Sequence, residues 1–167
     1  MYRFSVLIRD AVEADIPAIT QIFNSVIDSS NSVYREARVP ESERLTWFHE
    51  KREHDFPIIV AEEEGQVIGY GGYGTFRAAQ GYRLTVEHTI HIHDAHRGKG
   101  LGKMILAELI KRATDAGVHV MLGAIDSGNE GSIKLHEKFG FIECARIKEV
   151  AIKRGQYLDL VFLQKIL

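Results

Sequence analysis

The segment His88–Met104, with the sequence HTIHIHDAHRGKGLGKM, constrains the fold more than any other stretch of the chain. It joins a β-branched run typical of a strand to an amphipathic pattern that predicts a helix over residues 101–117. Between them lies Arg97-Gly98-Lys99-Gly100-Leu101-Gly102, an R-x-x-G-x-G pattern. Glycines let backbone N–H groups approach a phosphate at a helix N-terminus, so this unit predicts an α/β domain with an anion site.

The spacing within the loop excludes two common nucleotide-binding turns. A P-loop requires Ser or Thr after its lysine, but Lys103 is followed by Met104. A dinucleotide fingerprint requires G-x-G-x-x-G, but after Gly98-Lys99-Gly100 the position of the third glycine is occupied by Lys103. From spacing alone, the loop is either an anion cradle of another kind or a tight turn with solvated basic residues.

The other patterns surround this unit with alternating strands and helices. Two glycines, Gly117 and Gly140, are expected to close helices, and Asp15 and Asn129 are expected to cap them. The expected elements are a strand over 3–10, a helix from Asp15, a loop over 28–40, a helix over 41–55, a hairpin over 57–76 around Glu64-Gly65, a strand over 82–94, a strand over 119–125, a helix over 129–140 and two strands around 153–156. This order predicts a mixed α/β domain.

Composition bounds the organisation and the partners. The 167 residues, 45% of them hydrophobic, suit one domain spanning 1–167. With 21 basic and 23 acidic residues the net charge is −2, which provides no global attraction for nucleic acid or an anionic membrane. The single cysteine, Cys144, favours a reducing compartment, so we expect a cytoplasmic protein. Apolar stretches fall short of a membrane span.

Two separated motifs, HTIHIHDAHRGKGLGKMILAELIKRA and NEGSIKLHEKFGF, resemble the acyl-coenzyme A binding core of the GNAT superfamily of N-acetyltransferases. The segments YRLTVEHTIHI, KLHEKFGF and KRGQYLDLVFLQKIL resemble its phosphinothricin N-acetyltransferase branch, which acetylates the amino group of glutamate- and methionine-like compounds. The likeness runs from Ile8 to Leu167. It implies a mixed, mostly antiparallel central sheet with helices on both faces, acetyl-CoA as co-substrate, and a homodimer.

The resemblance also implies a coenzyme site. Backbone N–H groups of the loop would hold the coenzyme A pyrophosphate, and the strand before the loop would be splayed so that its backbone pairs with the pantetheine arm. Asn129 matches an asparagine that bonds the pantetheine, although a plain helix cap is an equal explanation. The implied residues are Thr89, Ile90, His91, Ile92, Arg97, Gly98, Lys99, Gly100, Leu101, Gly102 and Asn129.

Acetyl transfer to an amine requires a neutral nitrogen, so a base must take a proton from the ammonium group. The resemblance places the catalytic glutamate at Glu87, in TVEHT. It places at His136, in LHEKFGF, the group that protonates the departing thiolate. The alternatives are a solvated strand glutamate and a structural histidine.

For the acceptor, the resemblance assigns Arg77 as the cation that binds a carboxylate, and a guanidinium suits bidentate binding. Tyr34 and Phe76 match positions around the acceptor side chain, and Val86 and His88 flank the candidate base. Tyr34 is equally suited to anchoring a loop on the core. Arg35 and Arg38 are further candidates, in the segment NSVYREARVP where the chain departs most from the family pattern.

A metal site is the competing interpretation of the histidines. His91 and His93 share a strand face, and with Asp94 and His96 they offer ligand types that zinc accepts. The same residues are needed for the coenzyme strand and loop, and zinc sites usually include a distant ligand. We therefore predict no metal.

The sequence thus predicts an acetyl-CoA-dependent N-acetyltransferase of small amino-acid-like amines such as phosphinothricin, methionine sulfoximine and methionine sulfone. Two alternatives stay open, because one fold hosts many functions. One is an acetyltransferase of a peptide N-terminus or a polyamine. The other is a non-catalytic coenzyme A sensing module, in which Glu87 and His136 are structural.

Overall fold

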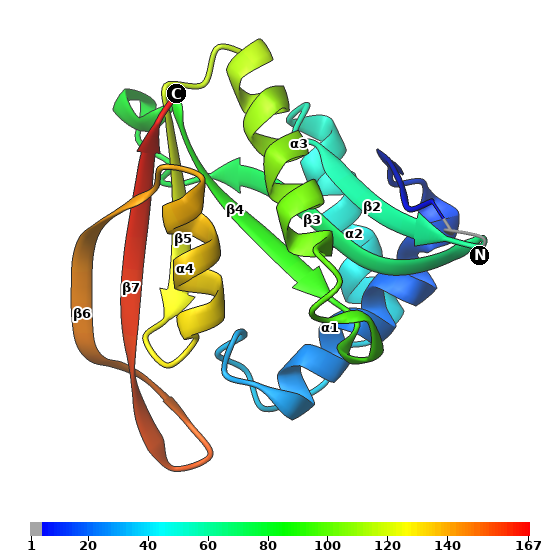
Figure 1. Ribbon diagram of the computed structural model, residues 1–167, viewed down its shortest axis with the longest axis horizontal. Helices are drawn as coiled ribbons and strands as arrows, with labels where there is room; N and C mark the ends of the chain where they lie inside the picture. The colour runs from blue at the N-terminus through cyan, green and yellow to red at the C-terminus, as the bar shows by residue number, and fades with distance from the viewer. Residues whose placement is uncertain (1–4) are drawn as a thin grey trace.

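The computed structural model describes residues 5–167 and contains seven strands and four helices in the predicted order (Figure 1). The strands are β1 (Leu7–Asp10), β2 (Ile58–Glu63), β3 (Gln66–Thr75), β4 (Thr85–Ile92), β5 (Val120–Asp126), β6 (Ile142–Lys153) and β7 (Gln156–Ile166). The helices are α1 (Ile16–Ser29), α2 (Glu41–Glu53), α3 (Leu101–Asp115) and α4 (Glu130–Lys138).

All seven strands form one sheet with the order β1-β2-β3-β4-β5-β7-β6. Every neighbouring pair is antiparallel except β4 and β5, which are parallel and are connected through α3. The predicted mixed, mostly antiparallel sheet is therefore confirmed. Its single parallel junction lies at the centre, where the glycine loop leaves β4.

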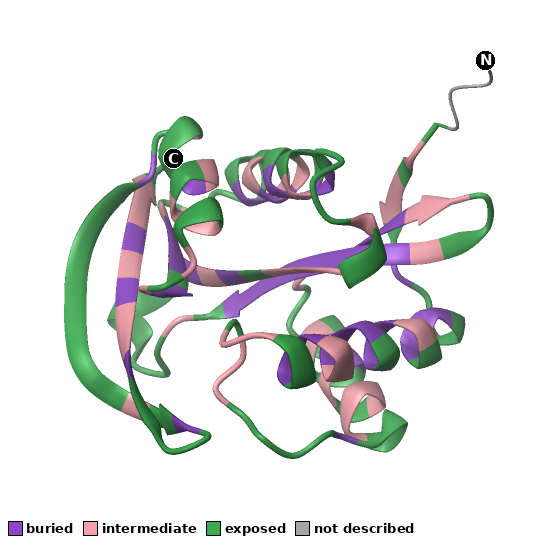
Figure 2. Ribbon diagram, turned by 60° about the horizontal axis from the view of Figure 1, so that its bottom comes forward, coloured by how far each residue is buried: buried purple, intermediate pink, exposed green. Residues whose placement is uncertain are grey.

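Helices cover both faces of the sheet, as predicted (Figure 2). The core beneath α1 and α2 is built on residues such as Ile19, Phe48 and Val60. The core beneath α3 contains Ile105, Leu109 and Val161. Because the central strands are buried on both faces, a polar side chain on β4 must face one core or the other.

The turns follow the sequence signals closely. The β2–β3 hairpin turns at Glu64-Gly65, and the β6–β7 hairpin turns at Arg154-Gly155. Gly117 and Gly140 follow α3 and α4 with φ values of 75° and 84°, as expected of helix-closing glycines. These turns and helix ends depend on the conformation of single glycines, so the sequence predicts them reliably.

Several element boundaries differ from the prediction by a few residues. The first strand begins at Leu7, and residues 3–4 of the predicted strand lie outside the described residues. The second and third helices end at Glu53 and Asp115, each two residues before the predicted end. Differences of two residues are typical of fraying helix ends.

Asp15 does not cap α1 with its side chain, contrary to the prediction. Its carboxylate accepts from the Val12 backbone N–H at 2.8 Å and pairs with the Arg9 guanidinium at 2.7 Å. The Asp15 carboxylate, which the helix pattern predicts to cap α1, is thus engaged by Arg9 of β1 instead.

The β6–β7 hairpin extends beyond the sheet and is tied down at its tip (Figure 1). Lys153 is only 1% exposed, and its Nζ donates to the backbone carbonyls of Ile27, Ser30 and Val33 at 2.8, 2.7 and 2.8 Å. The buried ammonium therefore joins the hairpin to the α1 C-terminus and to the α1–α2 loop, residues 30–40.

None of the helices within residues 5–167 combines the length and the apolar character required to cross a membrane.

Candidate active site

The centre of the site is the place where β4 and β5 separate. Their parallel register begins at Thr85↔Val120 and ends at His88↔Gly123. Beyond that point β4 continues to Ile92 on β3, and β5 continues to Asp126 on β7. The sheet is therefore splayed at the predicted residues, which turns the backbone edge of β4 from Thr89 to Ile92 toward a gap.

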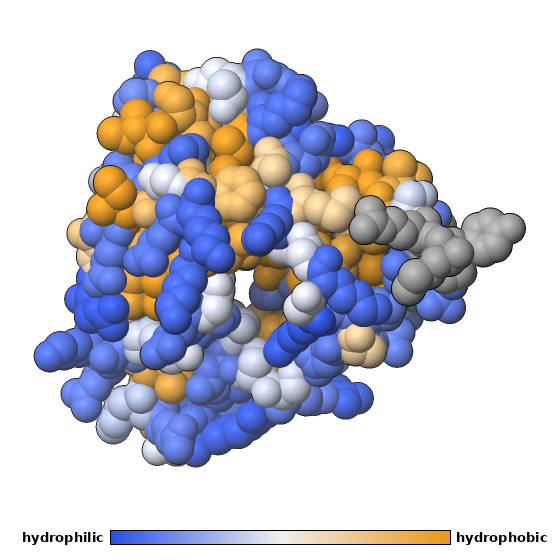
Figure 3. Space-filling model, in the orientation of Figure 1, coloured by the Kyte–Doolittle hydropathy of each residue, from blue (hydrophilic) through white to orange (hydrophobic). Residues whose placement is uncertain are grey.

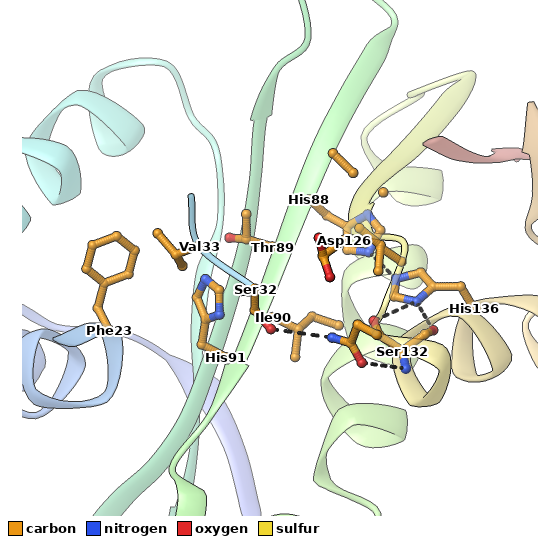
Figure 4. Close-up of a pocket in the computed structure, with 14 residues that line it drawn as sticks. Phe23, Ser32, Val33, His88, Thr89, Ile90, His91, Asp126, Ser132 and His136 are labelled. Atoms are coloured by element: carbon orange, nitrogen blue, oxygen red, sulfur yellow. Dashed lines mark hydrogen bonds between the residues drawn. The ribbon is translucent and has the colours of Figure 1, made fainter. Parts of the chain in front are cut away.

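Two adjoining cavities occupy this gap. The smaller, about 280 Å³, lies beside His88, Thr89, Asp126 and His136 (Figure 4). The larger, about 540 Å³, extends along Ile90–Ile92 to the glycine loop. They share six lining residues: Ser32, Ile90, His91, Asn129, Ser132 and His136. Figure 3 shows a hollow near the middle of this face of the molecule.

The larger cavity ends at the glycine loop and the first turn of α3. Gly98 and Gly100 have φ values of 77° and 82°, a conformation that side chains disfavour. Among residues 5–167, the five backbone N–H groups from Gly98 to Gly102 have no hydrogen-bond acceptor. Unpaired donors at the start of a 15-residue helix fit a diphosphate group, since the helix dipole adds favourable charge there.

We call Ile90–Ile92 with Arg97–Gly102 the coenzyme cradle. All of these residues line the larger cavity except Lys99, which is exposed with its Nζ 3.5 Å from His96 Nδ1. The Arg97 guanidinium pairs with Asp94 at 2.8 Å. The cradle therefore offers mainly backbone groups, with the basic side chains at its rim.

Asn129 performs the capping role that was one of its two predicted functions. Its Oδ1 accepts from the Ser132 N–H at 3.2 Å, and its Nδ2 lies 3.4 Å from the Ser32 hydroxyl. Asn129 lines both cavities, and its contact with Ser32 connects the start of α4 to the α1–α2 loop across the gap.

His88 and His136 point toward one another at the floor of the smaller cavity (Figure 4). Their Nε2 atoms are 2.8 Å apart, and the exposed fractions of the two residues are 5% for His88 and 4% for His136. His88 Nδ1 lies 2.8 Å from the Leu122 carbonyl oxygen, and His136 Nδ1 lies 2.6 Å from that of Ser132. Burial and the neighbouring His136 lower the pKa of His88 to about 3, and burial lowers that of His136.

Glu87 points to the opposite face of β4 from His88, because successive residues of a strand alternate. It is half-buried, and burial raises the pKa of its carboxyl group while Lys51 of α2 opposes that rise. Burial also lowers the pKa of the Lys51 ammonium, whose Nζ lies 3.4 Å from the Tyr73 carbonyl. A carboxylate with a raised pKa is chemically suited to accept a proton near neutral pH.

Of the predicted acceptor residues, His88 lines the smaller cavity, whereas Tyr34, Phe76, Arg77 and Val86 line neither cavity. Val86 is 2% exposed and packs in the core beneath α3, so its side chain does not reach an acceptor. Phe76 packs against Phe162, with ring centroids 6.4 Å apart. The exposed Arg77 forms no ion pair with a carboxylate among residues 5–167.

Tyr34 anchors the α1–α2 loop. Its hydroxyl donates to Asp126 Oδ1 at 2.8 Å and lies 3.1 Å from the Asp159 carbonyl oxygen. Arg35 and Arg38 are already paired, with Glu43 and Asp28 respectively. The structure therefore supports the loop-anchoring interpretation of Tyr34.

The histidines of the HIHDAH segment have separate partners. His91 packs against Phe23 and Tyr70 on the face covered by α1, and burial lowers its pKa to about 4. His93 Nδ1 accepts from the Ala95 N–H at 3.2 Å, and His96 Nδ1 lies 3.7 Å from Glu63. Within residues 5–167 no group of three potential metal ligands comes together.

Several residues that line the cavities were not predicted from the sequence. Asp126 ends β5, and Ser132 lies one helical turn before His136. Phe23 of α1 and Val33 of the α1–α2 loop line the smaller cavity from the other side. The i,i+4 spacing of Ser132 and His136 is the only one of these signals visible in the sequence.

The splayed β4–β5 pair and the glycine loop with unpaired N–H donors are the features that the family resemblance implies for an acyl-coenzyme A transferase. The sequence pattern of the family described as "Acetyltransferase (GNAT) family" matches residues 20–141. The chain therefore belongs to the GNAT acetyltransferase family.

Similar proteins agree with this assignment. The chain is 41% identical to the L-methionine sulfoximine/L-methionine sulfone acetyltransferase of Salmonella typhimurium, over 94% of this chain and 92% of that protein. Among solved structures, the ribosomal-protein-alanine N-acetyltransferase from Brucella melitensis has 43% identity and a TM-score of 0.95, covering 96% of this chain and 99% of that one.

A third similar protein is the phosphinothricin acetyltransferase of Sinorhizobium meliloti, solved in complex with AcCoA. It has 36% identity and a TM-score of 0.94, covering 97% of this chain and 88% of that one.

Proposed function

We propose that this protein is an acetyl-CoA-dependent N-acetyltransferase that acts on the amino group of small amino-acid-like substrates such as methionine sulfoximine, methionine sulfone and phosphinothricin. The observation that carries this proposal is the end of the β4–β5 register at His88↔Gly123, directly beside the two joined cavities. The similar methionine sulfoximine and phosphinothricin acetyltransferases favour the same acceptor class.

The coenzyme cradle would hold acetyl-CoA mainly through backbone groups. The N–H groups of residues 98–102 fit the pyrophosphate, and the open edge of β4 at Thr89–Ile92 fits the amides of the pantetheine arm. Asn129, on the opposite wall, is placed to bond the same arm. Acetyl-CoA supplies an activated acetyl thioester.

The chemistry at the junction would use two polar groups on opposite sides of β4. Glu87 takes a proton from the acceptor ammonium, so that the neutral amine attacks the thioester directly. Backbone N–H groups near Ile90 stabilise the oxyanion, and His136 provides the proton for the departing sulfur. No covalent enzyme intermediate is needed, and Cys144 is distant in sequence on the exposed strand β6.

Arg77 would bind the acceptor carboxylate, with Tyr34 and Phe76 shaping the acceptor side of the site. The exposure of the Arg77 guanidinium supports this role, since its cation packs only over Phe76, 5.3 Å from the ring centroid. His88 lines the smaller cavity, but its Nε2 already contacts His136 Nε2. We therefore expect His88 to contribute less to acceptor binding than Arg77 does.

A thiol-release assay with a panel of amines tests the proposal. Free methionine sulfoximine, methionine sulfone and phosphinothricin should be acetylated, whereas their carboxamides should react far more slowly because Arg77 loses its anionic partner. Equal rates for acids and amides, or preference for peptides with a free N-terminal amine or for polyamines, would favour the alternative acceptors. Tight coenzyme binding without turnover on any amine would favour the sensing module.

We further propose a homodimer located in the cytoplasm. Strand β6 forms one edge of the sheet and exposes Ile142 and Ile152, 73% and 59% exposed, in a surface that a second copy could cover. The unpaired Cys144 suits a reducing compartment. Sedimentation equilibrium tests the dimer, and a monomer at micromolar concentration contradicts it.

A further inference from the structure

The histidine pair at the floor of the smaller cavity has a protonation state that its hydrogen bonds determine. Both Nδ1 atoms face backbone carbonyl oxygens, Leu122 at 2.8 Å for His88 and Ser132 at 2.6 Å for His136. A carbonyl oxygen only accepts, so each Nδ1 must carry a hydrogen. In a neutral imidazole the other nitrogen, Nε2, is then a bare acceptor.

The two Nε2 atoms nevertheless lie 2.8 Å apart, which is a hydrogen-bond distance. Two bare acceptors repel at that distance, so one proton must lie between them. The other tautomer of His136 would let Nδ1 accept from the Ser132 hydroxyl, but that oxygen is at 3.5 Å and the carbonyl at 2.6 Å. The closer contact requires the Nδ1–H form.

The same surroundings disfavour a second proton. The Phe141 ring packs against both imidazoles, with centroids 5.6 Å from His88 and 5.1 Å from His136. The other titratable groups of the cavity are Asp126, which accepts from Tyr34 and from the Gly128 N–H, and His91, across the gap. Burial lowers the pKa of both rings, so the 2.8 Å contact between the two Nε2 atoms must hold the one shared proton against that cost, and the charge of that proton opposes a second.

We propose that His88 and His136 share one proton and act as a single acid, in which His136 delivers the proton to the departing sulfur and His88 is the positioning residue that keeps it there. His136 has this role because it lines both cavities, whereas His88 lines the smaller one alone. The inference rests on the proposed acetyl transfer and adds His88 to it.

The proton balance of the step is simple. As the carbon–sulfur bond breaks, sulfur keeps the electron pair and takes the proton from His136 Nε2, whose N–H bond electrons remain on nitrogen. The pair changes from one positive charge to none, and two lone pairs then face each other. Their repulsion makes the neutral pair basic, so it regains a proton from water before the next turnover. The proton that Glu87 takes from the ammonium leaves separately to solvent.

The first test examines the free protein and does not depend on activity. With ¹⁵N-labelled histidine, a strongly downfield proton attached to Nε2 is expected at neutral pH, and it should disappear in both His88→Gln and His136→Gln. The control His54→Gln, at the exposed C-terminus of α2, should retain it. Its absence from the wild-type spectrum, with both Nε2 atoms unprotonated, would overturn the shared proton.

The second test is a double-mutant cycle on turnover. Residues acting as one acid are not additive, so His88→Gln, His136→Gln and the double variant should each lose a similar factor in kcat, about 10²-fold, with the KM for acetyl-CoA nearly unchanged. A double variant whose loss in kcat equals the product of the two single losses would overturn the single acid. A wild-type rate in His88→Gln would do the same.

A pH profile separates this role from a structural one. An acid must be protonated, so kcat falls as pH rises through the pKa of the pair. Without the His88 acceptor, His136 holds its proton less firmly, and this basic limb should move to lower pH. An unmoved limb with an intact fold contradicts the proposal. If wild-type protein acetylates nothing while the downfield proton is present, the proposed function fails and the pair survives.

Discussion

The coenzyme cradle and the α1–α2 loop border the same gap but are held in different ways. The cradle is one stretch of chain, fixed by the register of β4 on β3 and by the start of α3. The loop is fixed by side chains from the C-terminal part of the chain. Asp126 accepts a hydrogen bond from Tyr34, and Lys153 donates to the carbonyls of Ser30 and Val33. The first region therefore depends on backbone geometry and the second on a few buried polar contacts.

If this division also separates coenzyme binding from acceptor binding, substitutions in the two regions should alter different kinetic constants. The following experiments test that expectation.

The largest effect is expected for Glu87→Gln, on β4 two residues before the open edge of that strand. The amide cannot take a proton from the ammonium, so kcat should fall by about 10²–10⁴-fold with the KM for acetyl-CoA unchanged. Steady-state kinetics measures both, and Glu53→Gln, at the end of α2, is the control. Unchanged turnover at neutral pH would remove Glu87 from the mechanism.

The next effect is expected for Lys153→Met, which keeps the length of the side chain and removes its donors. Buried carbonyl groups that lose their partner cost on the order of 1–3 kcal/mol, and denaturant unfolding should show a loss of that size. The loosened α1–α2 loop should raise the KM for the acceptor but not for acetyl-CoA. Lys148→Met, exposed on the same strand, should change neither. A raised acetyl-CoA KM alone would break the division between the regions.

A smaller effect is expected for Gly100→Ala in the coenzyme cradle. Its φ of 82° costs a residue with a Cβ about 1–2 kcal/mol, and relief of that strain would move the N–H donors. The KM for acetyl-CoA should rise about tenfold, with the acceptor KM unchanged. Gly65→Ala is a matched control, since its φ is 78° and its added Cβ also meets open space. It should lose similar stability and no coenzyme affinity; equal coenzyme effects would contradict a specific role for the loop.

The smallest effect concerns pH. Lys51 opposes the burial that raises the pKa of Glu87, so Lys51→Met should raise that pKa further. The base works only when ionised, and the acidic limb of the kcat/KM profile should therefore move to higher pH. Activity should fall at acidic pH and persist at alkaline pH. A shift in the opposite direction would show that Lys51 and Glu87 do not interact.

The difference between the regions also explains what the sequence could predict. The order of elements and the hairpin turns follow from local signals, namely apolar periodicity and glycine spacing. The glycine spacing leaves the loop open between an anion site and a tight turn, and the family resemblance implies the coenzyme role. The splay at Thr89–Ile92 came from the family resemblance, and the register confirmed it.

Contacts between distant segments were not predictable in this way. Nothing in the sequence shows that His88 meets His136, 48 positions later, or that Lys153 is buried by carbonyls more than 100 positions before it. Val86 is among the predicted acceptor residues, yet strand alternation turns its side chain into the core. The side chains of adjacent residues on a strand point to opposite faces of the sheet.

The open edge of β4 has a consequence for how such enzymes diversify. A co-substrate bound through main-chain groups makes few demands on which side chains occupy the strand, so substitutions there need not abolish its use. The acceptor side depends on individual side chains and can change one residue at a time. A directed-evolution library confined to the α1–α2 loop and the residues around Phe76 and Arg77 should therefore yield new amine preferences in variants that still use the same acyl donor.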